Sequence, residues 1–462
     1  MPLRVYDTRT REKHELSTLK EGKVSMYVCG ITPYSPSHLG HARCYLAFDV
    51  VHRWLEASGY DVDYVQNFTD IDDKILVISD SEGVDFSVVA NRNIDDYLEV
   101  MDAMNVLRAD HYPRVTETIP EIIDMISKLV EKGHAYVGDD GVYFEIDTAP
   151  EKFGQLTGQT LDMVRAGAGG RVTETGLGKR DHRDFALWKL AKSGEPSWDS
   201  PWGKGRPGWH IECSAMSLNH FGKQFDIHGG GHDLRFPHHE AEIFQSECCT
   251  GVEPVVGCWM HNGFVNIDGE KMSKSLDNFW TIREAFENHA PLALRYALLS
   301  VPYRNPIDLT PEFLDEAAMH FDRLVHAYGK SLVSQADSGT DLDEASERFT
   351  SAMNDDFNTR AAMIEVQSVV SSASGTDVAT WLEKHAGAVL GLLPPSGEVA
   401  AELAQAESAR TEVAGRVEIL LAERESSRES KDWARADEIR DELASMGVVV
   451  EDGPDGPTWH LE

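Results

Sequence analysis

The sequence predicts an α/β protein in which a parallel sheet is interrupted by an inserted subdomain and followed by helices. Three observations support this prediction: a strand, a loop and a helix follow one another near the amino terminus, residues 121–205 break that rhythm, and the chain becomes helical and acidic from about residue 311. At 462 residues with 41% hydrophobic composition, the chain exceeds what one core usually supports, which predicts two to four domains.

The first α/β unit is predicted within residues 24–70. Residues 24–30 (VSMYVCG) predict a strand that ends in a loop containing glycine and proline, and a helix begins at Gly40 with apolar residues three and four apart. Residues 60–68 alternate enough to predict the next strand, and Thr69 and Asp70 are candidates to cap the helix that follows.

The insertion is predicted to contain a helix over 122–132, a strand over 142–145 and a stretch rich in glycine, arginine and threonine over 166–179. The α/β pattern resumes near Trp209, with a strand over 225–228, a turn at the glycines 229–231 and a helix over 237–248. The sheet is therefore expected to be split around the insertion.

A helical bundle and a small module of a helix and a hairpin are expected after residue 311. Linkers or tight turns are predicted at 338–339 and 394–397. Residues 448–450, a turn over 452–457 and a tryptophan at 459 predict the hairpin, and a glycine at 447 ends the last helix. That helix is expected to have one apolar face, formed by Trp433, Ala436, Ile439, Leu443 and Met446.

Composition narrows the class of protein. No run of eighteen apolar residues is present, and residues 1–4 (MPLR) begin no apolar segment, so we expect neither a membrane span nor a secretory signal. Six cysteines are too few and too scattered for a disulfide framework, which fits a reducing compartment. A cytoplasmic enzyme is the expectation.

The formal net charge of -35, from 78 acidic and 43 basic residues, is extreme for a chain of otherwise globular composition. An acidic surface of this kind is typical of proteins from salt-loving organisms, in which molar salt screens self-repulsion; simple solubility is the alternative. The same charge would repel a polyanion at low salt, so a nucleic acid partner requires locally clustered basic residues or a high working salt.

Two pairs of basic side chains have the spacing of phosphate-binding residues. His38 and His41 lie at a predicted helix start, where backbone N–H groups and the helix dipole attract phosphate. Lys271 and Lys274 lie in a loop, where they could neutralise a triphosphate and a leaving pyrophosphate. Either pair alone could belong to an ordinary polar loop, but their joint presence, about 230 residues apart around an α/β domain, favours ATP chemistry.

Four residues far apart in the chain have side chains that suit zinc. His238 and Glu242 are four apart on a predicted helix and share a face, Cys29 lies at a strand end, and Cys213 ends the segment WHIEC. The residues alone do not establish that single ligands from distant segments converge, and burial of the cysteines in the core is the alternative. The other cysteines, at positions 44, 248, 249 and 258, are expected in the core.

These residues lie within motifs through which the chain resembles the cysteinyl-tRNA synthetases, a family of class I aminoacyl-tRNA synthetases, over nearly its whole length. The motifs are YVCGITPYSPSHLGHAR (27–43), NFTDIDDKI (67–75), DFALWK (184–189), PWGKGRPGWHIECSAM (201–216), GGGHDLRFPHHEAEIFQSE (229–247), WMHNGFV (259–265) and KMSKS (271–275). As a set, they are far more specific than any one of them.

With this resemblance, the expected fold is a Rossmann-type catalytic domain split by an inserted subdomain. The expected divisions are the first catalytic half (1–120), the inserted connective subdomain (121–205), the second catalytic half (206–262), the KMSKS loop and stem-contact region (263–312), the helical bundle (313–398) and the C-terminal anticodon-recognition module (399–462).

The resemblance implies an ATP site and a reaction. The cysteine carboxylate would attack the α-phosphorus of ATP, which magnesium accompanies, and pyrophosphate would leave; a terminal ribose hydroxyl of tRNA(Cys) would then take the aminoacyl group. Catalysis would fall to His38, His41, Lys271 and Lys274. The whole ATP site would be His38, Gly40, His41, Lys271, Met272, Ser273, Lys274 and Ser275.

The resemblance also implies that Cys29, Cys213, His238 and Glu242 hold one zinc ion per subunit, to which the substrate L-cysteine binds through its sulfur. Zinc favours a thiolate over the hydroxyl of serine, so selectivity would need no editing domain. Glu242 is our candidate for a ligand that leaves the metal when cysteine binds.

The cysteine pocket is expected to include Thr69, Trp209 and Asp233, with Trp209 over the side chain and Asp233 near the ammonium group. A role in the core or as a helix cap is the alternative for each. Candidate contacts to tRNA phosphates are Arg165, Arg171, Lys179, Arg180, Lys189, Arg416, Arg435 and Arg440. For Arg435 and Arg440, ion pairs within an acidic helix are the alternative.

Two other functions remain open at this point. A paralogous ligase of mycothiol synthesis activates cysteine with ATP and zinc and joins it to an amino sugar, and a catalytically silent paralogue would only bind RNA. Residues 355–358 and 431–447, with Trp459, resemble the bundle and the anticodon-reading module of the synthetase and favour tRNA. Intact His38, His41, Lys271 and Lys274 argue against the silent binder. A monomer is the favoured oligomeric state.

Overall fold

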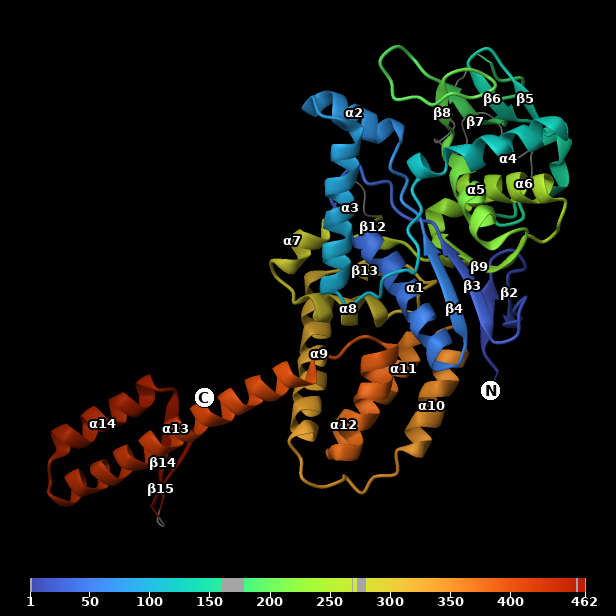
Figure 1. Cartoon of the computed structure of the whole chain (residues 1–462). Coiled ribbons are helices and arrows are strands. Elements are labelled where there is room, and N and C mark those ends of the chain that lie inside the picture. The colour runs from blue at the N-terminus through green and yellow to red at the C-terminus, as the bar shows by residue number, and fades with distance from the viewer. Residues whose placement is uncertain (1, 160–177, 268, 272–279, 454–455, 462) are drawn as a thin grey trace. The chain divides into compact units, whose positions relative to one another are not determined.

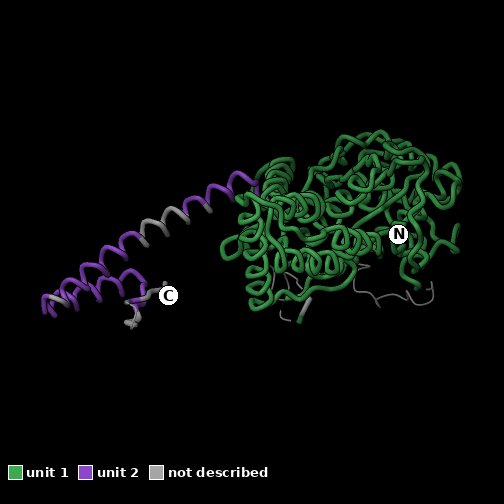
Figure 2. Tube along the Cα trace, turned by 90° about the horizontal axis from the view of Figure 1, so that it is seen from below, with its two compact units in different colours: residues 1–393 green, residues 394–462 purple. Residues whose placement is uncertain are grey.

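The computed structural model describes residues 2–159, 178–267, 269–271, 280–453 and 456–461. The chain divides into two compact units, residues 1–393 and 394–462 (Figure 2). The predicted α/β class with a parallel sheet and C-terminal helices is confirmed. The finer domain boundaries within the first unit stay predictions.

A four-stranded parallel sheet in the order β10-β9-β3-β4 organises the first unit. β3 (Lys23–Val28) pairs with β4 (Asp61–Gln66) on one side and with β9 (Phe225–Gly231) on the other, and β10 (Val256–Asn262) follows β9. The strand order therefore reverses between β3 and β9. In open α/β sheets, ligands bind at the carboxyl ends of the strands at such a point.

The predicted turn at the glycines 229–231 is wrong, because these residues complete β9. A Cβ atom at Gly229 would lie 2.2 Å from the ring of Phe48 in α1 (Leu39–Ala57). Glycine thus allows the strand to approach this helix closely rather than to turn.

The predicted cap at Thr69 and Asp70 is also wrong. The next helix, α2 (Asp73–Glu82), begins later, and the Asp72 carboxylate caps it by accepting a bond from the backbone N–H of Lys74. Thr69 instead donates to Glu212 over 3.0 Å, and Asp70 accepts from the hydroxyl of Thr116 over 2.6 Å. Bonds to distant segments thus occupy both side chains.

The insertion contains the predicted helix, α4 (Ile119–Glu131), and a four-stranded antiparallel sheet in the order β5-β6-β7-β8. Only its second strand was predicted; β5 and β8 are three residues long, too short for a clear periodicity. Residues 166–177 of the glycine-rich stretch lie outside the described residues. The strands are β5 (Ala135–Val137), β6 (Gly141–Phe144), β7 (Phe185–Leu190) and β8 (Gly205–Pro207).

The insertion and the catalytic sheet share one hydrophobic core. Phe144 of the insertion packs edge-on against Phe244 of α6 (His238–Thr250), with ring centroids 5.5 Å apart. α6 and α5 (Trp209–Phe221) lie beside α4 in Figure 1. The inserted residues are therefore packed to support the helices that follow β8 and β9.

The remaining helices of the first unit include a bundle after residue 311 (Figure 1). Its members are α9 (Pro311–Leu332), α10 (Asp343–Asn354), α11 (Thr359–Ser372) and α12 (Thr376–Leu382), which continues as a π-helix over Glu383–Val389. The other elements are β1 (Arg4–Asp7), β2 (Glu12–Glu15), α3 (Phe86–Ala103), β11 (Val265–Ile267), β12 (Glu270–Lys271), α7 (Ile282–Phe286), α8 (Pro291–Leu299), β13 (Ile307–Leu309) and the short 3-10 helices Val115–Glu117, Ile146–Thr148, Pro150–Lys152 and His232–Arg235.

A buried arginine joins the bundle to the sheet domain. Arg295 of α8 is fully buried, pairs with Asp49 of α1 and donates to the carbonyl oxygen of Leu390 over 2.7 Å and that of Met104 over 3.0 Å. Because a buried charge requires both a partner and hydrogen bonds, this network fixes the bundle on α1.

The second unit consists of α13 (Ser396–Glu429), α14 (Trp433–Ser445) and the hairpin of β14 (Val448–Gly453) and β15 (Gly456–Leu461). The predicted apolar face of the last helix is present at Ala436, Ile439 and Leu443, which are buried. It is wrong at Trp433, which is 59% exposed because it is the first residue of α14, beyond the small core around Ile439.

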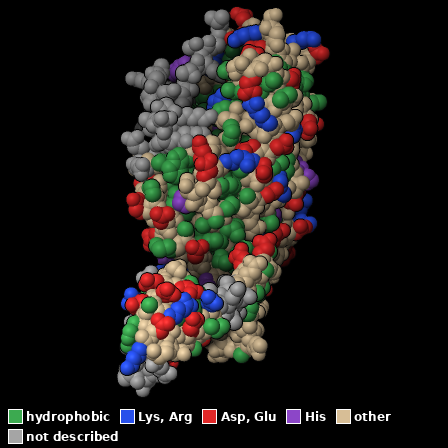
Figure 3. Space-filling model, turned by 90° about the vertical axis from the view of Figure 1, so that its left-hand side faces the viewer, with side chains coloured by type: hydrophobic (Ala, Val, Ile, Leu, Met, Phe, Trp, Pro, Cys, Tyr) green, Lys and Arg blue, Asp and Glu red, His purple; other side chains and the backbone are tan. Residues whose placement is uncertain are grey.

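None of the helices in the described part of the chain has the length and apolar character of a membrane span. On the face drawn in Figure 3, Asp and Glu side chains are spread over the surface with Lys and Arg among them.

Candidate metal centre and nucleotide site

The four predicted metal ligands come from segments that meet at the carboxyl ends of β3 and β9. Cys29 directly follows β3, Cys213 lies in the second turn of α5, and His238 and Glu242 lie one turn apart at the start of α6. Each of these residues is at most 3% exposed. The structure thus brings all four together in one buried cluster.

The spacing of the four ligand atoms fits a single metal ion. The Sγ atoms of Cys29 and Cys213 are 3.4 Å apart, and Glu242 Oε1 lies 3.5 Å from Cys29 Sγ and 3.2 Å from His238 Nε2. Two thiolates each about 2.3 Å from a tetrahedral zinc ion lie about 3.8 Å apart, and a thiolate and a nitrogen lie closer. Small side-chain rotations would therefore suffice to hold zinc.

Burial shifts the pKa values of Cys29, Cys213 and His238 toward their neutral forms. Burial raises the pKa of the Cys29 thiol well above its usual value and also raises the pKa of Cys213, while burial lowers the pKa of His238 to about 3. Zinc binds the thiolate and the neutral imidazole. The histidine is thus ready to coordinate, whereas the thiols must release protons when a metal binds.

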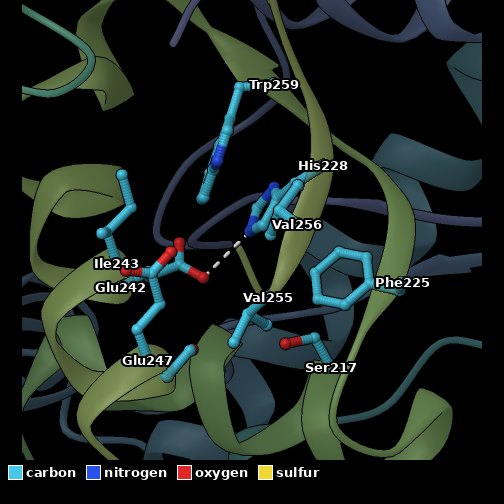
Figure 4. A pocket seen from close by; sticks show the side chains of 10 residues that line it. Ser217, Phe225, His228, Glu242, Ile243, Glu247, Val255, Val256 and Trp259 are labelled. Atoms are coloured by element: carbon cyan, nitrogen blue, oxygen red, sulfur yellow. Dashed lines mark hydrogen bonds and ion pairs between the residues drawn. The ribbon is translucent and has the colours of Figure 1, made fainter. Parts of the chain in front are cut away.

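A second possible ligand set overlaps the first and was missed from the sequence. Cys29, His228, His239 and Glu242 also present ligand atoms within 4.8 Å of one another. His228 lies in β9, and its Nε2 atom is 2.9 Å from Glu242 Oε2. Figure 4 shows these two side chains facing each other in a small pocket. Glu242 therefore turns one oxygen toward His238 and Cys29 and the other toward His228.

A chain of imidazoles extends from this cluster. His239 Nε2 lies 3.3 Å from Cys29 Sγ, His239 Nδ1 lies 2.8 Å from His261 Nε2, and His261 Nδ1 lies 2.8 Å from the Thr8 hydroxyl. The adjacent pair His238-His239 was the available sequence signal, but only the fold shows that the two rings reach the same cluster from consecutive positions.

A close backbone approach fixes the Cys29 loop. A Cβ atom at Gly30 would lie 1.5 Å from the carbonyl oxygen of Asn67, so this position has no room for a side chain. The Asn67 side-chain oxygen accepts from the Gly30 N–H over 2.8 Å and lies 3.6 Å from Cys213 Sγ. The strand ends of β3 and β4 are thereby tied to the metal cluster.

Of the three residues expected in the cysteine pocket, Trp209 lies against the metal cluster. Its ring stacks on that of His238, with centroids 4.6 Å apart, and the residue is 38% exposed. Thr69 is buried and donates to Glu212, the residue before Cys213. Asp233 is exposed in the short helix after β9, where its carboxylate would meet a Cβ atom at Gly231.

His38 and His41 cap the first turn of α1 reciprocally. The Nδ1 atom of each ring accepts the backbone N–H of the other residue, over 3.3 and 3.4 Å, and the rings stack with centroids 3.6 Å apart. Because Nδ1 is the acceptor, the proton of each neutral ring is on Nε2. Both rings are thus oriented as Nε2–H donors, as binding to phosphate requires.

The segment after the KMSKS motif is bonded to this turn. Leu39 donates to the carbonyl oxygen of Trp280 over 3.2 Å, and Ile282 donates to that of Ser37 over 2.9 Å. Lys271 ends β12, and its side chain is not described; Met272, Ser273, Lys274 and Ser275 lie outside the described residues. Gly40 occupies the first turn of α1.

A cavity of about 390 Å³ opens beside Trp209 and His210. His210 Nδ1 lies 3.2 Å from His238 Nδ1, which leaves His238 Nε2 directed at Glu242. Aromatic side chains, cations and carboxylates share the lining, which includes Phe185, Lys189, Phe236, Asp184 and Glu240. Its volume is suitable for a ligand of nucleoside size.

Most of the predicted tRNA contacts that the structure describes have acidic partners. Lys189 pairs with Asp73, Arg180 with Glu145, and Arg416 with Glu442. The ion-pair alternative for the last helix is confirmed, because Arg435 bonds to Glu438 and Arg440 lies 3.8 Å from Asp437. Lys179 lines the 390 Å³ cavity. Arg165 and Arg171 lie outside the described residues.

Two protein families match this chain, one over its N-terminal part and one near its C-terminus. The family described as tRNA synthetases class I (C) catalytic domain matches residues 15–319, and the family described as Cysteinyl-tRNA ligase anticodon binding domain matches residues 410–459. The chain is 46% identical to the cysteine–tRNA ligases of Salmonella agona (strain SL483) and Salmonella typhimurium (strain LT2), over 99% of this chain and 99% of each relative.

Solved structures at low identity share the fold. Mycobacterium tuberculosis methionyl-tRNA synthetase in complex with methionyl-adenylate superposes with a TM-score of 0.58 at 16% identity, covering 76% of this chain and 82% of that one. The ternary complex of Agrobacterium radiobacter K84 agnB2 LeuRS with tRNA and LeuAMS gives a TM-score of 0.61 at 12% identity, covering 84% and 85%.

Proposed function

The chain belongs to the cysteine–tRNA ligase family of class I aminoacyl-tRNA synthetases, and from this premise we propose how its residues attach L-cysteine to tRNA(Cys). The observation that carries the assignment is a buried cluster at the point where the strand order reverses. The ligand atoms of its members all lie within 4.8 Å of one another; these members are Cys29, Cys213, His238 and Glu242. A site that must select a thiol substrate is expected to contain such a set.

We assign zinc to this cluster as one ion per subunit. When bound, it would supply a soft Lewis acid that favours the sulfur of cysteine over the hydroxyl of serine. The chain's own residues orient the site: His210 holds His238 by its Nδ1 atom, and His228 holds the second oxygen of Glu242. Such outer partners keep the ligands in position.

His228 offers a hydrogen-bond partner to Glu242 if this carboxylate leaves the metal. Glu242 Oε2 is 2.9 Å from His228 Nε2, so the carboxylate has a hydrogen-bond partner whether or not Oε1 contacts the metal. A buried carboxylate without a partner would be costly. This contact supports Glu242 as the exchangeable ligand.

In the first step, the cysteine carboxylate forms a bond to the α-phosphorus of ATP, and the bond to pyrophosphate breaks. The Nε2–H groups of His38 and His41 are assigned to the phosphate oxygens, where charge develops. Lys271 and Lys274 are assigned to the leaving pyrophosphate, with magnesium on ATP and with Gly40, Met272, Ser273 and Ser275 completing the nucleotide site. Most of the rate acceleration would come from positioning the reactants and from stabilising the charge that develops on the phosphates.

In the second step, the terminal ribose hydroxyl of tRNA(Cys) bonds to the carbonyl carbon of cysteinyl-adenylate, and AMP leaves. The 390 Å³ cavity beside Trp209 is our assignment for the incoming acceptor end, since its aromatic side chains suit the stacking of a base. Thr69 and Asp233 are retained as cysteine-pocket residues. Cytoplasmic location and a monomeric state are part of the same proposal.

A charging assay tests the proposed function. Full-length protein with unfractionated tRNA and ATP should attach labelled cysteine and not serine, across a range of potassium chloride up to molar levels. Cysteine-dependent pyrophosphate exchange without charging would instead favour ligation to an amino sugar. The match of residues 410–459 to an anticodon-binding family supports tRNA as the acceptor.

A groove between α9 and α11 is our proposed binding surface for the tRNA backbone. It has a volume of about 640 Å³ and is lined by Arg323, His326 and Lys330 from α9 and by Ser371 and other small residues from α11. Among the ion pairs of the described residues, none involves Arg323 or Lys330, in contrast to the paired arginines of the last helix. Unpaired cations beside hydroxyl groups suit phosphate.

Replacing both Arg323 and Lys330 with glutamate should weaken tRNA binding. The slope of the logarithm of the binding constant against the logarithm of the salt concentration should become shallower by about one for each phosphate that the protein no longer neutralises. Pyrophosphate exchange should stay at the wild-type level, because the groove is separate from the metal cluster. The matched control is Lys20→Glu, an exposed lysine of the same unit. Equal tRNA affinity for the double variant and the control would contradict the assignment.

A further inference from the structure

A second group of metal-ligating side chains lies at the surface, apart from the buried cluster. Asp63, His111 and His220 each offer a ligand atom within 4.8 Å of the others. His220 Nε2 is 3.0 Å from one Asp63 oxygen and 3.1 Å from the other, and His111 Nε2 is 3.9 Å from the first. Both imidazoles therefore present the same nitrogen to one carboxylate.

Each of the three residues lies in a segment whose backbone is hydrogen-bonded into the fold. Asp63 faces outward in the middle of β4. His111 continues the sheet beside β4, because its N–H donates to the carbonyl oxygen of Tyr64 over 3.2 Å and its carbonyl oxygen accepts from Gln66 over 3.0 Å. His220 lies in the last turn of α5. The three side chains are thus positioned by backbone structure rather than by a loose loop.

The distances fit a small divalent cation. Nitrogen and oxygen ligands about 2.0 to 2.2 Å from one ion lie roughly 2.8 to 3.6 Å apart at neighbouring positions, from octahedral to tetrahedral geometry. The separation of His220 and Asp63 is within that range, and His111 needs a movement of under about 1 Å to reach it. The imidazole rings are tilted by 52° with centroids 4.6 Å apart, so they do not block each other.

The local charge also favours a cation. Asp61 lies two residues away on the same face of β4, and Asp110 directly precedes His111. Lys23 is a nearby base: it bonds to Asp61 over 2.6 Å, and Asp63 also contributes to the raised pKa of Lys23. Asp63 thus lies among carboxylates, in a chain whose formal charge is -35.

We propose that Asp63, His111 and His220 form a second, exposed metal site that binds a borderline first-row divalent cation such as Zn²⁺. Two imidazoles and one carboxylate suit zinc, nickel or copper better than magnesium or calcium, which prefer oxygen. With only these three protein ligands, water completes the coordination and the ion exchanges readily. The buried cluster, with four ligands and two sulfurs, binds its metal more tightly.

Binding at this site would clamp two elements that build the buried cluster. α5 carries both His220 and Cys213, which are seven residues and thus about two turns apart, and β4 leads into Asn67 beside Cys213. An ion at the exposed site would join the end of α5 to the edge of β4. The loaded protein therefore unfolds at a higher temperature than protein with only the buried site filled.

The test is a titration of full-length protein, already zinc-loaded at its buried cluster, with zinc chloride in an isothermal calorimeter. One further equivalent should bind, and its affinity should fall at least tenfold in H220A, H111A and D63N. H14A, which removes an exposed histidine from β2, should bind as the wild type does. Cysteine-dependent pyrophosphate exchange at the wild-type level shows that each variant is folded.

Cobalt distinguishes the two sites spectroscopically. Cobalt at the buried cluster gives sulfur-to-metal charge-transfer absorption, whereas the further equivalent should add only the weak bands of nitrogen and oxygen ligands. The absence of a further equivalent, or one that survives H220A unchanged, would overturn the proposal. A further equivalent with charge-transfer absorption would also overturn it, because the exposed site contains no sulfur.

Discussion

The replacement Cys213→Ser tests whether the buried cluster holds a metal that cysteine activation requires. Zinc binding worth about 10 to 16 kcal/mol, shared by four ligands, gives roughly 2.5 to 4 kcal/mol for each. Losing one thiolate should then weaken the metal by about 100- to 1000-fold. The Cβ–O bond of serine is shorter than the Cβ–S bond of cysteine, and a hydroxyl oxygen is a poor ligand for a soft metal. Serine therefore does not replace the lost thiolate.

The fold itself should tolerate the replacement. Cys213 Sγ lies 3.6 Å from Asn67 Oδ1, so a serine hydroxyl at this position has an acceptor nearby, and the change in the free energy of unfolding of the metal-free protein should be about 1 kcal/mol. The readouts are metal content after gel filtration and cysteine-dependent pyrophosphate exchange, both of which should fall at least about 100-fold.

Cys248→Ser is the matched control, because Cys248 is a buried cysteine of α6 outside the cluster. It should keep both metal and exchange. Full metal content and exchange in the Cys213→Ser protein would refute the reasoning. Equal loss in the two variants would also refute it, since the effect would then come from core packing alone.

Three further outcomes follow from the same structure. Burial lowers the pKa of His238 from 6.5 to about 3, so between these pH values the unfolded chain binds a proton that the folded protein does not. The metal-free protein should therefore lose stability as the pH falls from about 6.5 toward 3. An unfolding midpoint that does not change over this pH range, measured by circular dichroism, would disprove this. Gly30→Ala should displace the Cys29 loop from the Asn67 carbonyl and reduce both metal content and thermal stability, whereas Gly397→Ala, which meets no atom within 4 Å, should change neither. Arg295→Ala should cost about 2 to 4 kcal/mol of unfolding free energy in urea, because the carbonyl oxygens of Leu390 and Met104 lose their Arg295 donor while Asp49 keeps its ion pair with Arg53; a cost below about 1 kcal/mol would show that the network is not required.

Glu242 joins the proposed metal site to a group of buried histidines. One of its oxygens faces Cys29, His238 and His239, and the other faces His228; the chain of imidazoles continues from His239 to His261. A movement of the Glu242 carboxylate would therefore change its contacts with these buried imidazoles. His228→Gln would keep a hydrogen-bond donor near Glu242 and is the mildest way to disturb that connection.

Local sequence patterns predicted three of the four strands of the parallel sheet, β3, β4 and β9, but not β10. The strands that became β3 and β4, the start of α1 at residues 39–40 and the α6 helix all follow from apolar spacing and from glycine and proline in the intervening loops. These features depend on neighbours within one or two turns, which the sequence displays directly. The short strands β5 and β8, with three residues each, offer too little pattern to recognise.

The errors arose where a distant segment competed with a local signal. The glycines 229–231 resemble a turn, but the ring of Phe48 in α1 requires a residue without a side chain at Gly229. Thr69 has the chemistry of a helix cap, but Glu212 accepts its hydroxyl. The tRNA contacts of the arginines near the end stay predictions, and carboxylates on the same module pair with them.

The sequence by itself determined the family and the reaction and predicted which side chains can hold a metal, because motifs such as GWHIEC and FPHHEAE keep the proposed ligands at fixed short spacings. Only the tertiary structure decided which atoms meet: that His228 and His239 share Cys29 and Glu242 with the predicted set, and that Asp63, His111 and His220 converge at the surface. The physical reason is that spacing along a strand or helix is set locally, whereas ligand atoms from separate segments meet only after the sheet order and the packing of α5 and α6 are fixed.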